Sequence, residues 1–567
     1  MSIQSAVMPS PSISIIPNKA IAGGVASQLM SGDEAVAAAA LDAGVRFASS
    51  YPGTPATDIL ESLIRYSDPK KVRCVWSINE KVAYESALAV AIAGQRSFVS
   101  MKQVGLNVAA DAFMNSCPGG TNAGLVLVVG DDPECHSSQN KQDTRHYRAM
   151  SGALLLEPSD AQEAYSMTRE AFLVSERFLL PIIIRLTSRT AYGCTPVQRK
   201  PADAGAATFN WPREPQRFFI VPTVSRRLFL RISKLQCEMA QWIAESAFSY
   251  RKDASRRCGK RFGILCTGIG SALSCEYLPA NAGMLKVGGE PFPDDEIGSF
   301  VNAHDEILVL EEGDALLEQR ARALARQGVI VRGRISGDLK PVGELQVSEI
   351  VAAISGENAT NSPPPPDLPA RLPEICKPCG YHKVFGALKQ LSNIATPSDI
   401  GCNSLGGLPP YSVMDGVWAM GSSIGVACGL AAIGHPRIVA IIGDSTFFHA
   451  GIPPTIEAVH EAYALTILLL DNGTAAMTGG QGVAHRSSGN PIQNGIDMIR
   501  LIGSLGVARC TPFDPHKLGQ DGIRDLVEQS FSEPGVKVLL YRSQCGVYSP
   551  GYFTESNPNK TRLEREE

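Results

Sequence analysis

A strand–helix–strand pattern in the last third of the chain constrains its fold more than any other feature. Residues 437–444 (RIVAIIGD) form an apolar run that ends in a carboxylate, and residues 465–471 form a second continuous apolar run. Between them, residues 452–464 have a helical pattern, with Pro453 and Pro454 tolerated in the first helical turn. Strands that are apolar throughout are typically buried on both faces of parallel sheets. The pattern therefore predicts a right-handed crossover between two parallel strands.

Polar residues stand at the ends of both predicted strands. Asp444 ends the first strand, and Asn472 comes directly after the second. The carboxyl ends of parallel strands share one edge of the sheet, where ligands bind. Two side-chain oxygens and the backbone carbonyl of Thr474 suit Mg²⁺, which completes its shell with phosphate and water, and Gly443 lets a diphosphate approach the backbone. The alternative is an ordinary crossover in which Asp444 and Asn472 only cap turns.

Length, charge and cysteine usage limit the class of protein. With 567 residues, the chain is long enough for three or four domains. A net charge of −4 and a sequence pI near 6.2 argue against a nucleic-acid partner. The 14 cysteines are scattered and no signal-peptide pattern opens the chain, so we expect reduced thiols and a cytoplasmic location. No apolar run approaches the roughly 20 residues that span a bilayer, so we expect no membrane span.

The chain divides at a run of four prolines, which favours an extended spacer between modules. Helical patterns alternate with short apolar strands on both sides of it. This predicts an α/β fold of two doubly wound parallel-sheet domains with a smaller α/β domain between them. The expected parts are a flexible tail (1–29), a first sheet domain (30–205), a middle domain with a helical connection (206–355), the proline-rich linker (356–369), a last sheet domain (370–550) and a polar tail (551–567).

Two neighbouring motifs resemble those of known enzymes. Gly443-Asp444-Ser445 followed by Asn472 resembles the Gly-Asp-Gly…Asn motif of thiamine-diphosphate enzymes, with Ser445 in place of the last glycine. Residues 476–481 (AMTGGQ) are similar to a signature of 2-oxoacid:ferredoxin oxidoreductases. The resemblance implies that the two sheet domains bind the pyrimidine and the diphosphate of thiamine diphosphate, and that the middle domain is similar to the C-terminal domain of transketolase.

Further stretches resemble the large, or alpha, subunit of indolepyruvate ferredoxin oxidoreductases. They occur in order over roughly residues 30–550, and several are too long for chance agreement. The matching stretches are residues 51–57 (YPGTPAT), 79–83 (NEKVA), 100–111 (SMKQVGLNVAAD), 132–140 (DPECHSSQN), 376–382 (CKPCGYH) and 401–410 (GCNSLGGLPP), with weaker matches at 285–288 and 310–312.

Thiamine diphosphate also needs a carboxyl group against its aminopyrimidine ring, so that the ring can take the imino tautomer and C2 can lose its proton. Burial raises the pKa of a carboxyl group and suits it to share that proton. Glu80, between a short apolar strand and a helix, is the candidate by position, and Glu85 is the runner-up. An acid in a first helical turn also interacts well with the helix dipole, so position alone leaves both interpretations open. The resemblance implies that Glu80 is the tautomerising acid.

The resemblance implies roles for further residues. Thr54 would border the reacting carbon, and Lys102, Gln103 and Asn107 would hold the carboxylate of a 2-oxoacid; a solvated lysine beside a core strand is the alternative for Lys102. The catalytic candidates are Glu80, Thr54, Lys102 and Gln103; the cofactor-binding candidates are Glu80, Cys379, His382, Gly401, Cys402, Ser404, Gly443, Asp444, Ser445, Asn472, Thr474 and Met477; the metal candidates are Asp444, Asn472 and Thr474.

Cysteines and histidines offer few other candidates. Cys376 and Cys379 have the Cys-x-x-Cys spacing of a zinc site or a redox pair, but no second pair follows. We therefore favour a loop packed near the diphosphate, with His382 directed to phosphate or to a backbone carbonyl. Of the other histidines only His449, in the loop after Asp444, is worth testing, since the rest carry no ligand spacing.

The chain departs from the subunits that it resembles in three ways. Those subunits usually end in a module with two Cys-x-x-Cys-x-x-Cys-x-x-x-Cys-Pro runs, and no such run occurs here. We therefore expect this chain to ligate no iron–sulfur cluster. Gln103 stands where those subunits commonly have histidine, which implies different proton handling. Residues 376–379 (CKPC) replace a more glycine-rich loop.

Three functions remain open. The first is oxidative decarboxylation of an aryl 2-oxoacid such as indolepyruvate, using thiamine diphosphate and Mg²⁺, by a dimeric large subunit that works with a smaller subunit, an electron acceptor and coenzyme A. The second is a non-oxidative decarboxylase or carboligase, which the missing cluster module supports. The third is a catalytically silent thiamine-binding subunit. Glu80, Asp444 and Asn472 together argue against the third, because a decayed site should have lost one of them.

Overall fold

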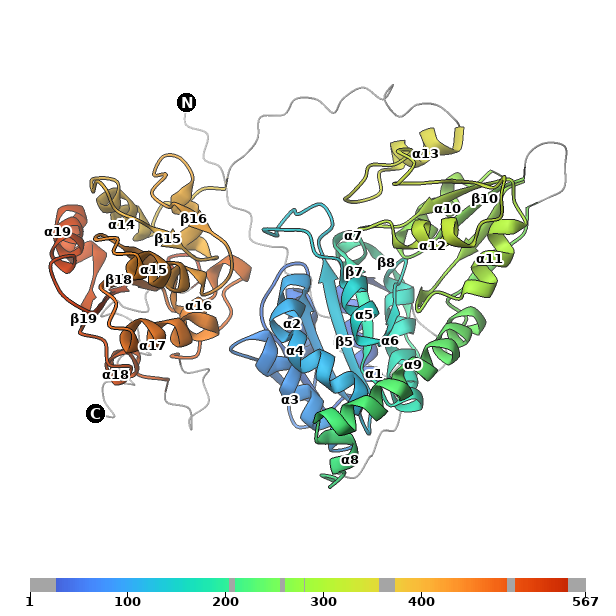
Figure 1. The fold of residues 1–567 in the computed structure, drawn as a ribbon, viewed down its shortest axis with the longest axis horizontal. Helices are drawn as coiled ribbons and strands as arrows, with labels where there is room; N and C mark the ends of the chain where they lie inside the picture. The colour runs from blue at the N-terminus through green and yellow to red at the C-terminus, as the bar shows by residue number, and fades with distance from the viewer. Residues whose placement is uncertain are drawn as a thin grey trace.

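Three large sheets with their helices, and one two-stranded ribbon, make up the described part of the chain, as seen in a computed structural model. In Figure 1 the first large sheet and its helices (blue to teal) lie between the middle sheet (green to yellow) and the last sheet (orange to red). The predicted α/β class is confirmed, whereas the predicted domain boundaries stay a prediction. The structure describes residues 27–202, 210–254, 261–279, 281–355, 373–486 and 495–548. The predicted proline-rich linker (356–369), the tail 551–567 and residues 1–26 of the predicted flexible tail lie outside the described residues.

The first sheet has seven strands in the order β12-β6-β7-β5-β4-β2-β3, all parallel except the edge strand β12. Its strands are β2 (Phe47–Ser50), β3 (Arg73–Trp76), β4 (Ser97–Lys102), β5 (Leu125–Asp131), β6 (Leu154–Leu156), β7 (Ile182–Thr187) and β12 (Gly289–Glu290). A separate two-stranded ribbon pairs β1 (Ser27–Ser31) with β8 (Cys194–Gln198), so the last residues of the predicted tail form a strand.

Helices cover both faces of the first sheet. The cluster around Phe98 and Val126 packs α1, α2 and α6 on one face, and the cluster around Met101 and Leu127 packs α3 and α4 on the other. All residues of β5 are buried, which fits its continuous apolar run. The helices are α1 (Gly32–Asp42), α2 (Thr57–Tyr66), α3 (Glu80–Ile92), α4 (Gln103–Gly119), α5 (Thr144–Ser151), α6 (Ala161–Phe178) and α7 (Ser188–Tyr192).

The middle sheet has five strands in the order β14-β13-β10-β11-β9, with β9 antiparallel. The segment predicted to form the middle domain also supplies β12 to the first sheet. Strand pairing between β12 and β6, in addition to the chain connection, therefore links this segment to the first sheet. The strands are β9 (Tyr250–Lys252), β10 (Phe262–Cys266), β11 (Gly283–Lys286), β13 (Glu306–Leu310) and β14 (Ile330–Arg332); the helices are α8 (Pro215–Phe218), α9 (Pro222–Glu245), α10 (Ile269–Tyr277), α11 (Asp294–Asn302), α12 (Leu316–Leu324) and α13 (Val347–Ser355).

The last sheet has six parallel strands in the order β16-β15-β17-β18-β20-β19. Its strands are β15 (Pro397–Ser398), β16 (Gly416–Val417), β17 (Val439–Gly443), β18 (Leu465–Asp471), β19 (Arg509–Phe513) and β20 (Val536–Arg542). Its helices are α14 (Tyr381–Leu388), α15 (Ser422–Ala432), α16 (Asp444–Thr446), α17 (Ile452–His460), α18 (Met498–Ser504) and α19 (Pro515–Ser530), with short helical turns η2 (Cys402–Gly407), η3 (Phe447–Gly451) and η4 (Ala476–Thr478).

The predicted strand–helix–strand unit is present as β17, α17 and β18, with the two strands parallel. Two details differ from the prediction. Asp444 begins α16 rather than ending the strand, and α17 ends at His460, four residues before the predicted end. The register of the two strands places Gly443 opposite Leu470, so the residues that follow them, Asp444 and Asp471, leave the sheet at the same edge.

Among the described residues, no helix combines the length and the apolar composition needed to cross a membrane.

Candidate active site

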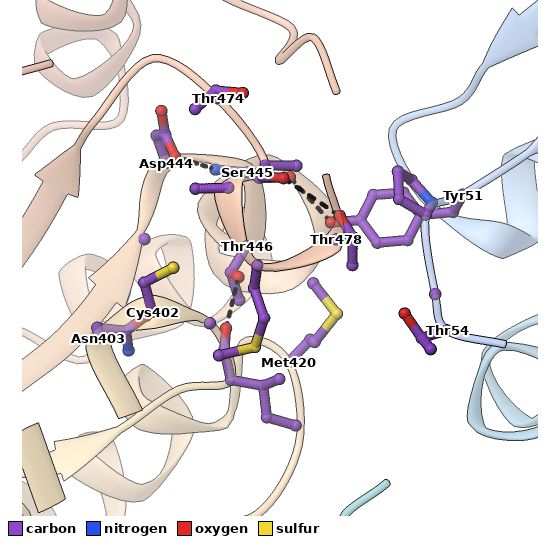
Figure 2. A pocket seen from close by; sticks show the side chains of 18 of the residues that line it. Tyr51, Thr54, Cys402, Asn403, Met420, Asp444, Ser445, Thr446, Thr474 and Thr478 are labelled. Atoms are coloured by element: carbon purple, nitrogen blue, oxygen red, sulfur yellow. Dashed lines mark hydrogen bonds between the residues drawn. The ribbon is translucent and has the colours of Figure 1, made fainter. Parts of the chain in front are cut away.

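A cavity of about 290 Å³ lies where the carboxyl edges of the first and last sheets meet. Tyr51, after β2, and Ser445, in α16, are hydrogen-bonded at 2.9 Å from the two sides of this junction, as Figure 2 shows. One chain therefore supplies both walls. The predicted site residues that line the cavity are Thr54, Glu80, Lys102, Gly401, Cys402, Gly443, Asp444, Ser445, Asn472, Thr474 and Met477.

The predicted metal residues lie together at the last sheet's side of the cavity. Asp444 is buried, and its two carboxylate oxygens accept hydrogen bonds from the backbone N–H groups of Ser445 at 2.8 Å and Gly473 at 2.9 Å. Oδ1 of Asn472 accepts from the backbone N–H of Thr474 at 3.1 Å. Side-chain oxygens such as those of Asp444 and Asn472 are the kind of ligand that Mg²⁺ prefers.

A second carboxylate and a histidine lie behind Asp444. Nε2 of His485 is 2.9 Å from Oδ1 of Asp471 and 3.6 Å from Oδ2 of Asp444. Burial and, to a smaller extent, the charge of Asp471 raise the pKa of Asp444 to about 7, while His485 opposes the shift. The sequence assigned no role to His485, which carries no ligand spacing. No spacing in the sequence signals it, because the contact depends on the register of β17 and β18.

Two glycines keep the floor of the cavity open. A Cβ on Gly443 would meet only Oδ1 of Asn403, at 3.7 Å, so the backbone there is accessible from the cavity. Gly401 has a φ of +144°, a conformation that favours glycine. Both observations fit the predicted approach of a diphosphate to the backbone.

Glu80 reaches the cavity from the first sheet's side. It is the first residue of α3, it is 6% exposed, and its Oε2 lies 2.7 Å from Nε2 of His449. Asn79 caps the helix by accepting a hydrogen bond from the N–H of Val82, so Glu80 begins a well-defined first turn. The runner-up acid Glu85 is exposed and forms an ion pair with Lys81, outside the cavity lining.

A lysine lies near Thr54 at another part of the cavity wall. Lys102 is buried, and its Nζ donates a hydrogen bond to the backbone oxygen of Ser137 at 2.6 Å. Burial lowers the pKa of Lys102 to about 8, with Asp132 opposing the shift. Oγ of Ser137 in turn donates to the backbone oxygen of Thr54 at 3.2 Å. The positive charge of Lys102 lies at the cavity wall and is only partly balanced by Asp132, which suits the binding of an anionic substrate.

Five predicted site residues do not line the cavity. Gln103 is fully buried, and its Nε2 donates to Oγ of Ser138. The imidazole of His382 contacts Tyr411 and the backbone oxygen of Cys376, the second of the two predicted orientations. The five residues are Gln103, Asn107, Cys379, His382 and Ser404. The cavity also has lining residues to which the sequence assigned no role: Tyr51, Tyr381, Asn403, Met420, Ser137 and Gln139.

Cys402 lines the cavity, and three other cysteines interact with it electrostatically. Burial, with added contributions from the thiols of Cys379, Cys545 and Cys376, raises the pKa of Cys402 to about 12. The same neighbours act on Cys379, whose pKa burial raises to about 11. The backbone N–H of Cys545 donates to the carbonyl of Asn472 at 3.1 Å, which holds this distant cysteine at the metal-binding loop. Sequence spacing hid the group because Cys402 and Cys545 are single cysteines.

Comparisons with known proteins agree with this geometry. Residues 38–223 match the family "Pyruvate flavodoxin/ferredoxin oxidoreductase, thiamine diP-bdg", and residues 399–539 match "Thiamine pyrophosphate enzyme, C-terminal TPP binding domain". The two matches fall on the two walls of the cavity.

Relatives extend over nearly the whole chain. The indolepyruvate oxidoreductase subunit IorA of Methanothermobacter thermautotrophicus is 38% identical over 548 residues, which cover 91% of this chain and 87% of the relative. The subunit of the same name from Thermococcus kodakarensis is 31% identical over 577 residues, covering 92% and 86%. A solved 2-oxoglutarate:ferredoxin oxidoreductase from Magnetococcus marinus aligns with a TM-score of 0.48 at 15% identity, over 58% of this chain and 65% of that one.

The fold and the two-walled cavity, with these matches, define a thiamine-diphosphate-dependent 2-oxoacid oxidoreductase. Within that class, the chain belongs to the family of the indolepyruvate oxidoreductase subunits IorA.

Proposed function

We propose that this chain catalyses the oxidative decarboxylation of an aryl 2-oxoacid such as indolepyruvate, with thiamine diphosphate and Mg²⁺. One observation carries the proposal: Glu80 and Asp444, an acid and a metal ligand from opposite walls, line the same cavity. When bound, thiamine diphosphate supplies the carbon nucleophile and the electron sink for loss of CO₂. The chain's own residues bind it, orient it and move protons. The relatives' names support an aryl substrate.

The metal would be held by Asp444, Asn472 and the backbone carbonyl of Thr474. Asp444 and Thr474 are buried, and Asp444 has no cationic side chain closer than His485 at 3.6 Å among the described residues. The carboxylate is therefore only partly compensated, as its raised pKa of about 7 indicates. A divalent cation would supply the missing charge and link the chain to a diphosphate.

Glu80 would exchange a proton with the aminopyrimidine ring. Its carboxyl group lies in a buried setting, where a proton is shared more readily than in water. Lys102 would hold the carboxylate of the 2-oxoacid, with Thr54 beside the reacting carbon. Gln103 would not contact the substrate. Its hydrogen bond to Ser138 would instead hold the loop whose Ser137 binds Lys102.

A simple incubation tests the reaction type. The purified chain is mixed with thiamine diphosphate, Mg²⁺ and indolepyruvate, and CO₂ and aldehyde are followed. The mixture is then supplemented with coenzyme A and an artificial one-electron acceptor. Turnover that appears only with the acceptor or with a smaller partner subunit supports the oxidoreductase. Rapid formation of aldehyde without acceptor instead identifies the non-oxidative decarboxylase, and cofactor binding without turnover under any condition identifies a silent thiamine-binding subunit.

The electrons would leave by one of two routes. The sequence predicts that this chain ligates no iron–sulfur cluster, so a smaller subunit would carry them. The group Cys376, Cys379, Cys402 and Cys545 favours a second route, since four thiolates are the ligands of an iron–sulfur cluster. Burial raises the pKa values of the Cys379 and Cys402 thiols, and a bound iron would deprotonate the thiols that ligate it.

Anaerobic reconstitution with iron and sulfide separates the two routes. Visible absorption and a paramagnetic signal on reduction, lost in Cys402→Ser and Cys545→Ser but kept in the control Cys194→Ser, would place a cluster in this chain. Cys194 is exposed and lies outside the group. Absence of iron in the wild type would leave the partner subunit as the route.

We also propose a homodimer in the cytoplasm. Exposed apolar side chains, such as Ile78 (46% exposed), Val108 (40%) and Ile433 (82%), are the kind of surface that a partner covers. Light scattering of the purified chain measures the oligomeric state, and a monomer at micromolar concentration would contradict the proposal.

A further inference from the structure

A histidine from the last sheet's wall holds the acid of the first sheet's wall. Nε2 of His449 lies 2.7 Å from Oε2 of Glu80, and the two side chains are 2% and 7% exposed. His449 belongs to η3, which directly follows α16, while Glu80 opens α3. A hydrogen bond to a carboxyl group withdrawn from water is stronger and more directional than one at the surface.

The imidazole has a fixed position. Nδ2 of Asn79, the residue before Glu80, donates to the backbone oxygen of His449 at 3.2 Å. The ring of Tyr51 meets the imidazole edge-on, with ring centroids 4.8 Å apart and an interplanar angle of 60°. Tyr51 is itself bonded to Ser445 across the same junction. Glu80, Asn79 and Tyr51, all from the first sheet's wall, therefore hold His449 in place.

The local backbone explains how His449 reaches this place. Residues Phe447–Gly451 form a π-helical turn between α16 and α17. A π-helical turn inserts an extra residue into a helix and changes the direction of the following side chains, and such turns occur often at functional sites. Phe447 is buried in the core of the last sheet, and His449 points to the other wall.

Glu80 divides its two oxygens between different surroundings. Oε2 faces His449, which does not line the cavity. On the other side, a Cβ on Gly105 would lie 2.7 Å from both Cγ and Oε1 of Glu80, so only glycine at the start of α4 leaves room for the carboxyl group. Because Glu80 itself lines the cavity, Oε1 is the oxygen left for a ligand there.

The hydrogen-bond pattern assigns the proton on the imidazole. Nδ1 of His449 is buried and has no hydrogen-bond partner among the described residues. A buried N–H without an acceptor is costly, so a neutral imidazole carries its proton on Nε2 and donates it to Glu80.

We propose that His449 is a positioning residue for Glu80. Its Nε2–H holds Oε2 and turns Oε1 toward the aminopyrimidine, so the acid is oriented only when the two walls are together. This rests on the proposed function, since it assigns a partner to the proposed acid. Nothing in the cavity lining reveals the role, because His449 lies behind Glu80.

Exchange of the C2 proton of bound thiamine diphosphate for deuterium tests the proposal. The exchange rate, measured by acid quench and NMR, depends on the acid but needs no 2-oxoacid, acceptor or partner subunit. It is compared in the wild type, Glu80→Gln, His449→Leu and His449→Gln, together with the Kd for the cofactor and the Tm. The amide nitrogen of glutamine reaches the place of Nε2, so His449→Gln keeps a donor.

A matched control removes a different hydrogen bond between the two walls. Nε2 of Gln481 donates to Oε1 of Glu61 at 2.7 Å, away from Glu80. Glu61→Ala should exchange like the wild type if orientation of Glu80, rather than contact between the walls in general, is what His449 supplies.

The expected result is a loss of about 10- to 100-fold in exchange rate for His449→Leu, the worth of one hydrogen bond to a charged group. His449→Gln should recover most of it, with Kd close to that of the wild type in both variants. Wild-type exchange in His449→Leu, or equal slowing in His449→Gln and His449→Leu, overturns the positioning role. If the wild type does not accelerate exchange over the free cofactor, or Glu80→Gln exchanges as fast as the wild type, the proposed function itself fails and the inference with it.

Discussion

Charged side chains are buried in two regions of this molecule, and their hydrogen bonding differs. Between the first and middle sheets lies an ionic network in which each guanidinium group bonds two carboxylates. Arg145 bonds Asp143 and Glu311, both at 2.6 Å. Arg185 bonds two others, at 2.6 Å each. The network consists of Asp131, Asp143, Arg145, Glu157, Arg185 and Glu311, and none of these side chains has a buried nitrogen or oxygen without a partner.

The cavity region has the opposite character. Buried atoms without a hydrogen-bond partner among the described residues include Oε1 of Gln103, Oδ1 of Asp399 and Nδ1 of both His449 and His485. Burial also raises the pKa of Asp399 to about 6 and that of Asp444 to about 7. The side chains named in both regions are buried, so burial alone does not distinguish a structural polar group from a functional one.

This difference in hydrogen bonding separates buried charges that stabilise the fold from those that are candidates for a functional role. A fully satisfied network holds two sheets in one arrangement, and its removal should cost stability alone. Buried polar groups left without a partner next to a cavity are candidates for a functional role. Substitutions in the two regions should therefore separate: one set should lower stability, and the other should lower activity at constant stability.

The largest effect is expected for the acid. Glu80→Gln keeps the size of the side chain but cannot exchange a proton, so turnover should fall about 10²- to 10⁴-fold. Cofactor Kd and Tm should stay near the wild-type values. Steady-state kinetics with the complete enzyme measures the loss, and Glu85→Gln, on the exposed side of the same helix, is the control. Full activity in Glu80→Gln would show that the site assignment is wrong.

The ionic network should behave in the reverse way. Arg145→Ala leaves Asp143 and Glu311 buried without their partner, which should destabilise the protein by about 3–5 kcal/mol. Chemical denaturation measures this, with Arg524→Ala, an exposed arginine, as the control. A Tm unchanged by Arg145→Ala, or a loss of cofactor affinity at constant Tm, would remove the contrast between the two regions.

A smaller effect is expected at the metal end. Asp444→Ala should weaken Mg²⁺-dependent cofactor binding by about 100-fold, since even groups that only orient metal ligands are worth 10- to 100-fold. In the wild type, the pKa of Asp444 is near 7, so below that pH a proton occupies the carboxylate and competes with the metal ion for it. Titration calorimetry should therefore show affinity falling as the pH decreases through 7. Binding that is independent of pH between 6 and 8 would argue against Asp444 as a ligand.

The smallest effect is expected at the substrate. Lys102→Met should raise KM about tenfold with little change in kcat, because one charge-assisted contact with a carboxylate is lost. The pKa of Lys102 is lowered to about 8, so in the wild type its charge, and with it substrate affinity, should disappear as the pH rises above 8 rather than above 10. A KM for Lys102→Met that equals the wild-type value would leave Lys102 as a structural lysine bonded to Ser137.

Much of the site was predictable because its residues stand at ends of strands and helices. The apolar runs of β17 and β18 predict their own burial, and parallel strands place Asp444 and Asn472 at one edge whatever surrounds them. Position alone left the role of Glu80 open, and the resemblance singled it out as the candidate acid. Side-chain contacts were less predictable. The resemblance implied that Gln103 holds the substrate carboxylate, yet its amide donates to Ser138 and does not line the cavity.

The partners of these residues were not predictable. His449 was named only as a candidate to test, and its bond to Glu80 joins residues 369 positions apart. His485 was dismissed for lack of spacing, although it lies between Asp444 and Asp471. Single residues such as these carry no periodic signal.

Periodicity and short spacings act within one element or one crossover, so they predict the α/β class and the strand–helix–strand unit, while the resemblance supplied most of the candidate site residues. Which side chains meet follows from the folded chain. The junction of the first and last sheets pairs Glu80 with His449, and strand register brings Asp471 and His485 behind Asp444. Contacts between distant segments depend on packing and register, and these follow from the whole chain rather than from any local pattern.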